Sequence, residues 1–213
     1  MRIALFLVCF SCLFGQSYHP KDFSYLLSLR DFDKELMEMH FTLYRGYVKN
    51  TNAVLQDLKN TKKGSQDYFG LKRRFSWEFN GMRLHEFFFE NIALEKEFLQ
   101  KSSPLSEQII QDFGSVDGWK KDFTQTGLLR GIGWVVLYFD PVQKRLFNSW
   151  IDDHNTGELL NADPICVMDV WEHAYITQFG LDRQKYIEIF LNNISWNILE
   201  ARFEMQIQDK KSY

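Results

Sequence analysis

Apolar residues recur with a helical period through most of the first half of the chain. From Phe32 to about Leu58 they fall on one stripe, and Asp33 stands where an N-cap residue is expected. A second stripe runs from roughly Phe75 to Leu99, and the polar stretch Lys59–Gln66 separates the two. The pattern therefore predicts two long helices packed as an antiparallel hairpin.

The pattern changes in the second half, where elements become shorter. Asp140-Pro141 reads as a turn between two segments rich in β-branched and aromatic residues, which predicts a β-hairpin. In chain order we expect helices at Ser106–Asp112 and Gly118–Gly127, strands at Trp134–Phe139, Arg145–Ile151 and Ile165–Met168, and a closing helix at Tyr186–Gln206. The expected fold class is α+β, with an N-terminal long antiparallel helical hairpin and a C-terminal α/β domain containing a small three-stranded antiparallel sheet.

The start of the chain has the pattern of a secretory signal peptide. Arg2 precedes an apolar run, Ile3–Phe14, that is too short to span a bilayer, and Gly15-Gln16-Ser17 offers small residues at a cleavage site. We therefore expect residues 1–17 to be removed and the protein to be exported, to a periplasm or to the extracellular space. An uncleaved anchor is the alternative. Residues 18–101 then form the N-terminal helical hairpin domain, and residues 102–213 form the C-terminal α+β domain.

Composition narrows the classes of partner. Lys and Arg number 25 against 28 Asp and Glu, so no basic surface for nucleic acid is expected. Beyond the leader there is no further long apolar run, so we expect no stable membrane association. Cys166 is the one cysteine after the leader, which excludes an intramolecular disulfide.

Histidines and one aspartate supply the candidate chemistry. His40 and His85 fall on the apolar stripes of the two predicted helices, and Asp169 and His173 stand four residues apart, which is one turn of a helix. Each histidine alone is more often a hydrogen-bonded core residue than a ligand. Burying all four groups together is costly unless they share a cation. Three imidazoles and one carboxylate suit iron or manganese, with zinc as the competitor.

Several segments together resemble the iron/manganese superoxide dismutase family. The resemblance extends over about residues 20 to 206, and the candidate ligands follow in the family's order. The segments that carry it are Phe32–His40, Leu84–Phe88, the Gly-x-Gly-Trp motif Gly131–Trp134, the signature-like Asp169–Tyr175, and Tyr186–Trp196.

The resemblance implies a function and a ligand set. His40, His85, Asp169 and His173 match the family's metal ligands, and the expected reaction converts superoxide to oxygen and hydrogen peroxide. We expect one metal ion per subunit, iron in preference, with manganese or either metal as the alternative. The resemblance also implies a homodimer or tetramer. The competing hypothesis is an inactive or different mononuclear metal-binding relative of the same fold.

Further residues around the metal follow from the same resemblance. In the family, a polar side chain that tunes the metal-bound solvent comes from one of two positions: four residues before the second ligand, or the loop before the strand that carries the aspartate ligand. Here the first position is Gly81, which has no side chain to donate a hydrogen bond, and the second is occupied by His154. Trp134 and Trp171 are expected to wall the pocket.

The tyrosine that gates the substrate channel has two candidates. Tyr47 stands seven residues beyond His40, one fewer than in the family. It can still face the metal if the usual helix carries an irregularity that is absent here. Tyr44, four residues beyond His40, is the other candidate.

Three expectations concern the subunit contact and the channel mouth. Glu172 should reach the ligand His173 of the neighbouring subunit. Tyr44 and Ile176 replace residues that usually pair between subunits, so this contact differs from the family's polar one. Arg183 matches the family's basic residue at the channel mouth and could steer the anionic substrate.

Overall fold

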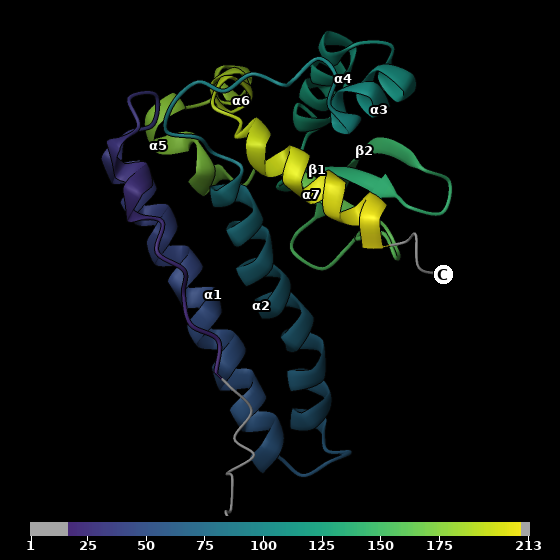
Figure 1. Cartoon of the computed structure of the whole chain (residues 1–213). Coiled ribbons are helices and arrows are strands. Elements are labelled where there is room, and N and C mark those ends of the chain that lie inside the picture. The colour runs from purple at the N-terminus through teal and green to yellow at the C-terminus, as the bar shows by residue number, and fades with distance from the viewer. Residues whose placement is uncertain (1–16, 210–213) are drawn as a thin grey trace, which may run out of the picture.

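The computed structural model describes residues 17–209 and has an N-terminal helical part followed by an α/β part (Figure 1). A long helical hairpin projects from the body, and the chain that precedes it runs back along the first helix. The elements in order are η1 (Ser24–Ser28), α1 (Lys34–Asn60), α2 (Gln66–Glu90), α3 (Pro104–Phe113), α4 (Val116–Gly127), β1 (Gly133–Asp140), β2 (Arg145–Asp152), β3 (Asp163–Asp169), η2 (Glu172–Ala174), α5 (Ile176–Phe179), α6 (Arg183–Asn192) and α7 (Trp196–Asp209). The expected α+β class and its helical hairpin are confirmed.

The second long helix lies earlier in the chain than its apolar stripe predicts. It begins at Gln66, where the Ser65 side chain caps it by accepting a hydrogen bond from the Tyr68 N–H. It ends at Glu90, and the prediction that it continues to Leu99 is wrong. Beyond that point the backbone leaves the helix, and the Ala93 N–H donates to the Asn193 carbonyl oxygen at 2.8 Å. Backbone pairing with a distant segment therefore overrides local helical periodicity.

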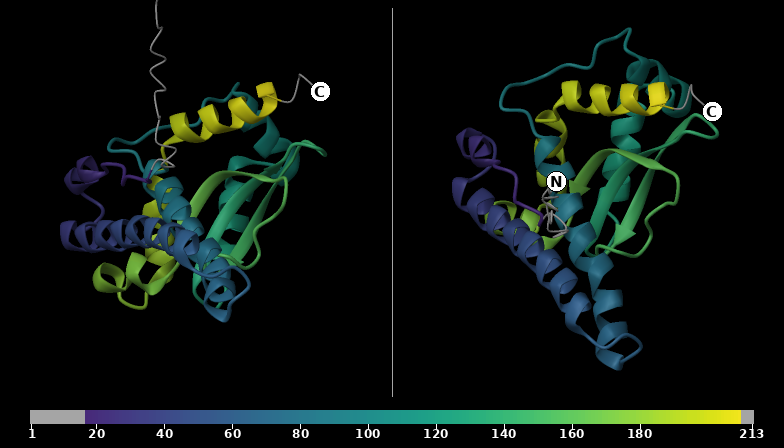
Figure 2. Two further views of the ribbon diagram at one scale, coloured as in Figure 1. Left: turned by 90° about the horizontal axis from the view of Figure 1, so that it is seen from below. Right: turned by 60° about the horizontal axis from the view of Figure 1, so that its bottom comes forward.

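The sheet has three antiparallel strands in the order β2-β1-β3. β1 is the central strand, and the residues from Gly133 to Phe139 are all buried. Helices α3 and α4 pack against β2, α4 also packs on β1, and α2 and α7 reach β3 (Figure 2). β3 thus joins the two parts of the chain, because one end of the helical hairpin rests on it.

The closing helix is broken, so the prediction of one helix from Tyr186 to Gln206 is wrong. α6 ends at Asn192 and α7 begins at Trp196. The three residues between them bond elsewhere: Ser195 N–H donates to the Asn91 carbonyl at 2.7 Å, and the Ser195 hydroxyl lies 3.3 Å from Glu97. These contacts hold the chain out of helical geometry.

The predicted leader, apart from its last residue, lies outside the described residues. Within residues 17–209, we find no helix with both the length and the apolar character needed to cross a bilayer.

The Tyr47 ring of α1 packs directly against Gly81 of α2. α1 is regular α-helix from Lys34 to Asn60, so Tyr47 returns after seven residues to nearly the same face as His40. A Cβ atom on Gly81 would lie 2.5 Å from the Tyr47 ring. Glycine at this position therefore gives the tyrosine ring its space.

We predict that Gly81→Ala destabilises the protein by about 1–3 kcal/mol, because the added methyl group overpacks the contact with the Tyr47 ring. Urea unfolding at one fixed protein concentration measures the change. The cost should largely disappear in a Tyr47→Ala background, since the atoms that clash are then gone.

Gly70 provides the matched control on the same helix. An added Cβ at Gly70 meets nothing within 4 Å, so Gly70→Ala should be neutral or stabilising by up to about 1 kcal/mol. Equal effects of the two substitutions would contradict the packing argument.

Candidate metal centre

The structure brings the four predicted ligands to one point. His40 comes from α1, His85 from α2, Asp169 from the last position of β3 and His173 from η2. One nitrogen or oxygen atom of each lies within 4.8 Å of the corresponding atoms of the others. The expectation that a single helical turn carries Asp169 and His173 is wrong, because a strand end and a short 3₁₀ turn bring them together instead.

Asp169 lies at the centre of the cluster. Its Oδ2 atom is 3.1 Å from Nε2 of His40, 3.1 Å from Nε2 of His173 and 3.7 Å from Nε2 of His85. The side chains of Asp169 and His85 are fully buried, while that of His173 is 20% exposed. The site is therefore closed on the side of the helical hairpin.

His85 gives the clearest sign of what the cluster holds. Its Nδ1 lies 2.5 Å from the Gly81 carbonyl oxygen, which can only accept, so Nδ1 carries the proton and Nε2 has a free lone pair. That Nε2 atom is buried and has no hydrogen-bond partner among the described residues. A buried lone pair aimed at a carboxylate and two imidazoles fits a metal cation.

The electrostatics of the cluster favour a negative Asp169 carboxylate and a neutral His85 ring. Burial opposes ionisation of Asp169, but the charge and hydrogen bonds of His173 and His40 outweigh it and lower the pKa of Asp169. Burial lowers the pKa of His85 well below its usual value, and His40 lowers it further. Neutral imidazoles and a carboxylate are the forms that bind a metal.

His154 lies beside this cluster and connects two aromatic residues. The indole N–H of Trp134 donates to its Nδ1 at 3.1 Å, so in the neutral ring the proton must be on Nε2. Nε2 in turn lies 2.6 Å from the Tyr47 hydroxyl. Burial lowers the pKa of His154 to about 4, which keeps the ring neutral.

Aromatic rings enclose His154 and the ligands. Trp134 packs against His85 with ring centroids 5.0 Å apart, and Trp171 stacks on His154 at 4.9 Å. Trp77 of α2 contacts His154 at 4.8 Å and is a wall residue that the sequence interpretation missed. Its spacing offered a signal, since Trp77, Gly81 and His85 are four residues apart on one helix face.

The two candidate gate tyrosines have different surroundings. The Tyr47 hydroxyl bonds to His154, and its ring lies 5.1 Å from that of His85. The Tyr44 hydroxyl accepts from the Lys21 backbone N–H and donates to Glu86, both at 2.9 Å. Tyr47 is therefore the one of the two that bonds to His154.

Arg183 and Glu172 lie at the edge of the site. The Arg183 guanidinium donates to the carbonyl oxygens of Leu129 and Gly131 at 2.8 Å and to the Tyr175 hydroxyl. Its steering role stays a prediction. Glu172 is exposed and makes no ion pair with any described residue, so its carboxylate is free to meet another molecule.

Comparison with known proteins gives consistent relatives. The family described as iron/manganese superoxide dismutases, C-terminal domain, matches residues 101–202. A superoxide dismutase (Fe) of Pyrobaculum aerophilum is 31% identical over 80% of this chain and 83% of that protein. A superoxide dismutase (Mn/Fe) of Aeropyrum pernix is 32% identical over 84% of this chain and 86% of its own length. A superoxide dismutase (Mn) of Haloferax volcanii is 30% identical over 79% of this chain and 85% of its own length.

Each of these relatives matches about four fifths of this chain. The structure also contains the four clustered donors and the three-stranded sheet that the resemblance implies. The chain belongs to the iron/manganese superoxide dismutase family.

Proposed function

We propose that this protein is a superoxide dismutase that holds one iron or manganese ion between His40, His85, Asp169 and His173. The observation that supports it most directly is the buried Nε2 lone pair of His85, which faces the Asp169 carboxylate without a hydrogen bond. When bound, the metal supplies one-electron chemistry, by which two superoxide ions and two protons become oxygen and hydrogen peroxide.

The residues around the metal control protons and water. Because Nε2 of His154 carries the proton, it donates to the Tyr47 oxygen and leaves the tyrosine O–H free to donate into the pocket. Burial raises the pKa of Tyr47 to about 12, so this hydroxyl keeps its proton at neutral pH. The hydrogen bonds from Trp134 to His154 and from His154 to Tyr47 thus fix the direction in which the Tyr47 O–H donates beside the ligands.

Iron is our preferred metal, and manganese or use of either is the alternative. Relatives named for iron, for manganese and for both are about equally similar to this chain. The choice therefore depends on residues near the ligands, among which His154 is the foremost candidate.

Removing a ligand should remove both metal and activity. Substituting a residue that only hydrogen-bonds to a metal ligand typically lowers metal affinity or activity by about 10–100-fold. Because His85 is itself a predicted ligand, His85→Ala should lower superoxide removal by at least that factor and abolish stoichiometric binding of iron or manganese. Elemental analysis and an activity assay of the iron- and manganese-loaded forms measure the two effects. His19→Ala is the control, since His19 is exposed and outside the cluster. Wild-type protein that binds metal without activity would favour the inactive relative.

Substituting His154 should change the metal preference. Glutamine keeps a donor and an acceptor but alters the distance to Tyr47, so His154→Gln should change the ratio of manganese-form to iron-form activity by about tenfold or more. Both forms of wild type and variant are assayed at equal metal content. An unchanged ratio would contradict a role of His154 in tuning the metal.

We propose a homodimer, or a tetramer built from it, in which Glu172 reaches His173 of the neighbouring subunit. Exposed Ile176 would lie in the same contact. Removing the Glu172 charge by Glu172→Gln should weaken the dimer by about tenfold or more, as measured by sedimentation of a dilution series. Glu107→Gln, at an exposed carboxylate of α3, should change nothing. Equal effects would exclude the bridge.

We also propose export, on the basis of residues 1–17 alone. The N-terminal residue of the protein recovered outside the cytoplasm tests it, and Tyr18 is the expected first residue.

A further inference from the structure

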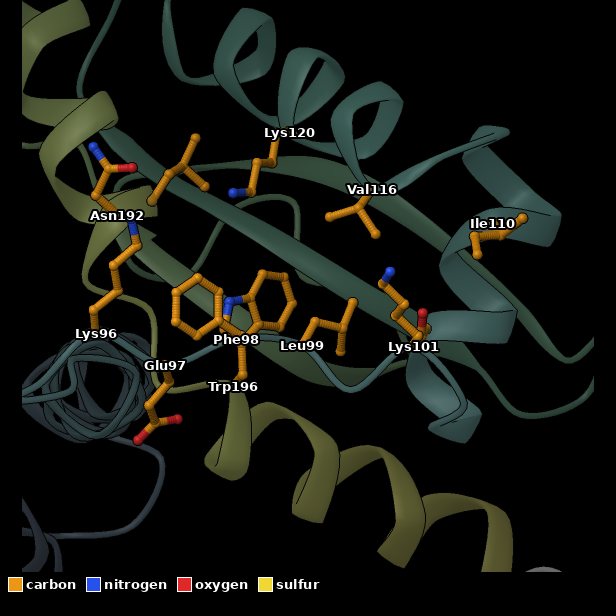
Figure 3. A pocket seen from close by; sticks show the side chains of 12 residues that line it. Lys96, Glu97, Phe98, Leu99, Lys101, Ile110, Val116, Lys120, Asn192 and Trp196 are labelled. Carbon is orange, nitrogen blue, oxygen red and sulfur yellow. The ribbon is translucent and has the colours of Figure 1, made fainter.

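A cleft with a volume of about 520 Å³ lies away from the metal ligands (Figure 3). The segment of residues 96–101, between α2 and α3, forms one side of it, and α3, α4 and the junction of α6 and α7 form the rest. None of the four metal donors lines it. Its volume is within the range of small-molecule sites in proteins.

The floor of the cleft is apolar and partly aromatic. Phe98 and Trp196 both line it (Figure 3), as do Leu99, Val116 and Ile110, and Trp196 is 5% exposed. Phe98 is 75% exposed and Ile110 49% exposed, so these side chains offer apolar surface to solvent. Such an arrangement suits a flat apolar body.

Three lysines surround this floor. Lys96, Lys101 and Lys120 all line the cleft, and none of them forms an ion pair with any residue in the described part of the chain. Nζ of Lys96 lies 5.5 Å from the Phe98 ring centroid, and Nζ of Lys120 lies 6.0 Å from that of Trp196. Three lysines against one glutamate, Glu97, leave the lining with an excess of positive charge, and a bound anion would reduce the repulsion between these lysines.

The one carboxylate in the lining is already engaged. Glu97 accepts hydrogen bonds from the Asn197 backbone N–H at 2.9 Å and from the Ser195 hydroxyl at 3.3 Å. Ser106 is 3% exposed and also lines the cleft, and its hydroxyl makes no hydrogen bond to another described residue. The lining therefore holds three lysines, one hydroxyl and a single carboxylate, which keeps its negative charge because both of its hydrogen-bond donors are neutral.

We propose that this cleft binds a small organic anion: a flat aromatic body with a carboxylate or sulfonate group. The body would lie on Phe98 and Trp196, and the charged group would face the lysines. Solvated surface lysines above an ordinary apolar patch are the simpler explanation. They predict that an apolar molecule binds equally well with or without a negative charge.

A matched pair of fluorescent probes separates the two explanations. Anilinonaphthalene sulfonate carries the charge, and phenylnaphthylamine has nearly the same aromatic body without it. Titration of the purified full-length holoprotein should show saturable binding of the sulfonate, at least about threefold tighter than the neutral probe.

Variants locate the site. Lys120→Gln and Lys101→Gln should each weaken the sulfonate by about three- to tenfold and leave the neutral probe unchanged. Phe98→Ser should weaken both probes, and its exposure means that the fold does not depend on it. Lys121→Gln is the matched control, because Lys121 is exposed on the same helix and does not line the cleft.

Dismutase activity should be the same in all of these variants, which also verifies their folding. Equal affinity for the two probes would overturn the proposal, as would sulfonate binding that both lysine substitutions leave intact. Binding that responds to Lys121→Gln as strongly as to Lys120→Gln would also overturn it.

Discussion

The buried carboxylate of Asp169 is the constraint on which the rest of the structure depends. Removing one ion from water costs several kcal/mol even after the protein relaxes, so Asp169 needs compensation from many sides. Its Oδ1 accepts the Trp171 backbone N–H at 2.8 Å, and its carbonyl oxygen accepts the Tyr186 hydroxyl at 2.6 Å. Its Oδ2 faces the three histidines. The helical hairpin and η2 therefore converge on the Asp169 carboxylate, while α6 holds the backbone of the same residue, and a bound cation would complete the compensation.

The regular geometry of α1 links Tyr47, Gly81 and His154, which lie far apart in the sequence. With α1 regular, the Tyr47 ring turns toward the metal ligands and fills the space beside Gly81. That space is then closed to any polar side chain from position 81. The hydrogen-bond partner of Tyr47 must come from elsewhere, and His154 provides it from the loop after β2. The regular α1 helix, Gly81 and His154 thus form a single consistent arrangement.

The sequence predicts the features of this fold that depend on local residue patterns. It does not predict the helix ends that are determined by contacts with distant segments. The helical hairpin and the four donors could be found because periodicity and spacing are carried by neighbouring residues. The end of α2 and the break before α7 could not, because both follow from pairing between the segments around Asn91 and Ser195. The choice between Tyr44 and Tyr47 depends on whether the helix is regular, which spacing alone leaves open.

The surroundings of Tyr44 show that its hydroxyl is bonded within its own chain. Glu86 is buried and accepts the Tyr44 hydroxyl, and Arg83 donates to the same carboxylate at 2.6 Å. Lys21, from the segment that precedes α1, donates its backbone N–H to Tyr44. The hydroxyl is therefore satisfied within one subunit and needs no partner across an interface. In the proposed dimer, an apolar residue such as Ile176 would then cost no buried hydrogen bond, and the polar link would be the one proposed for Glu172.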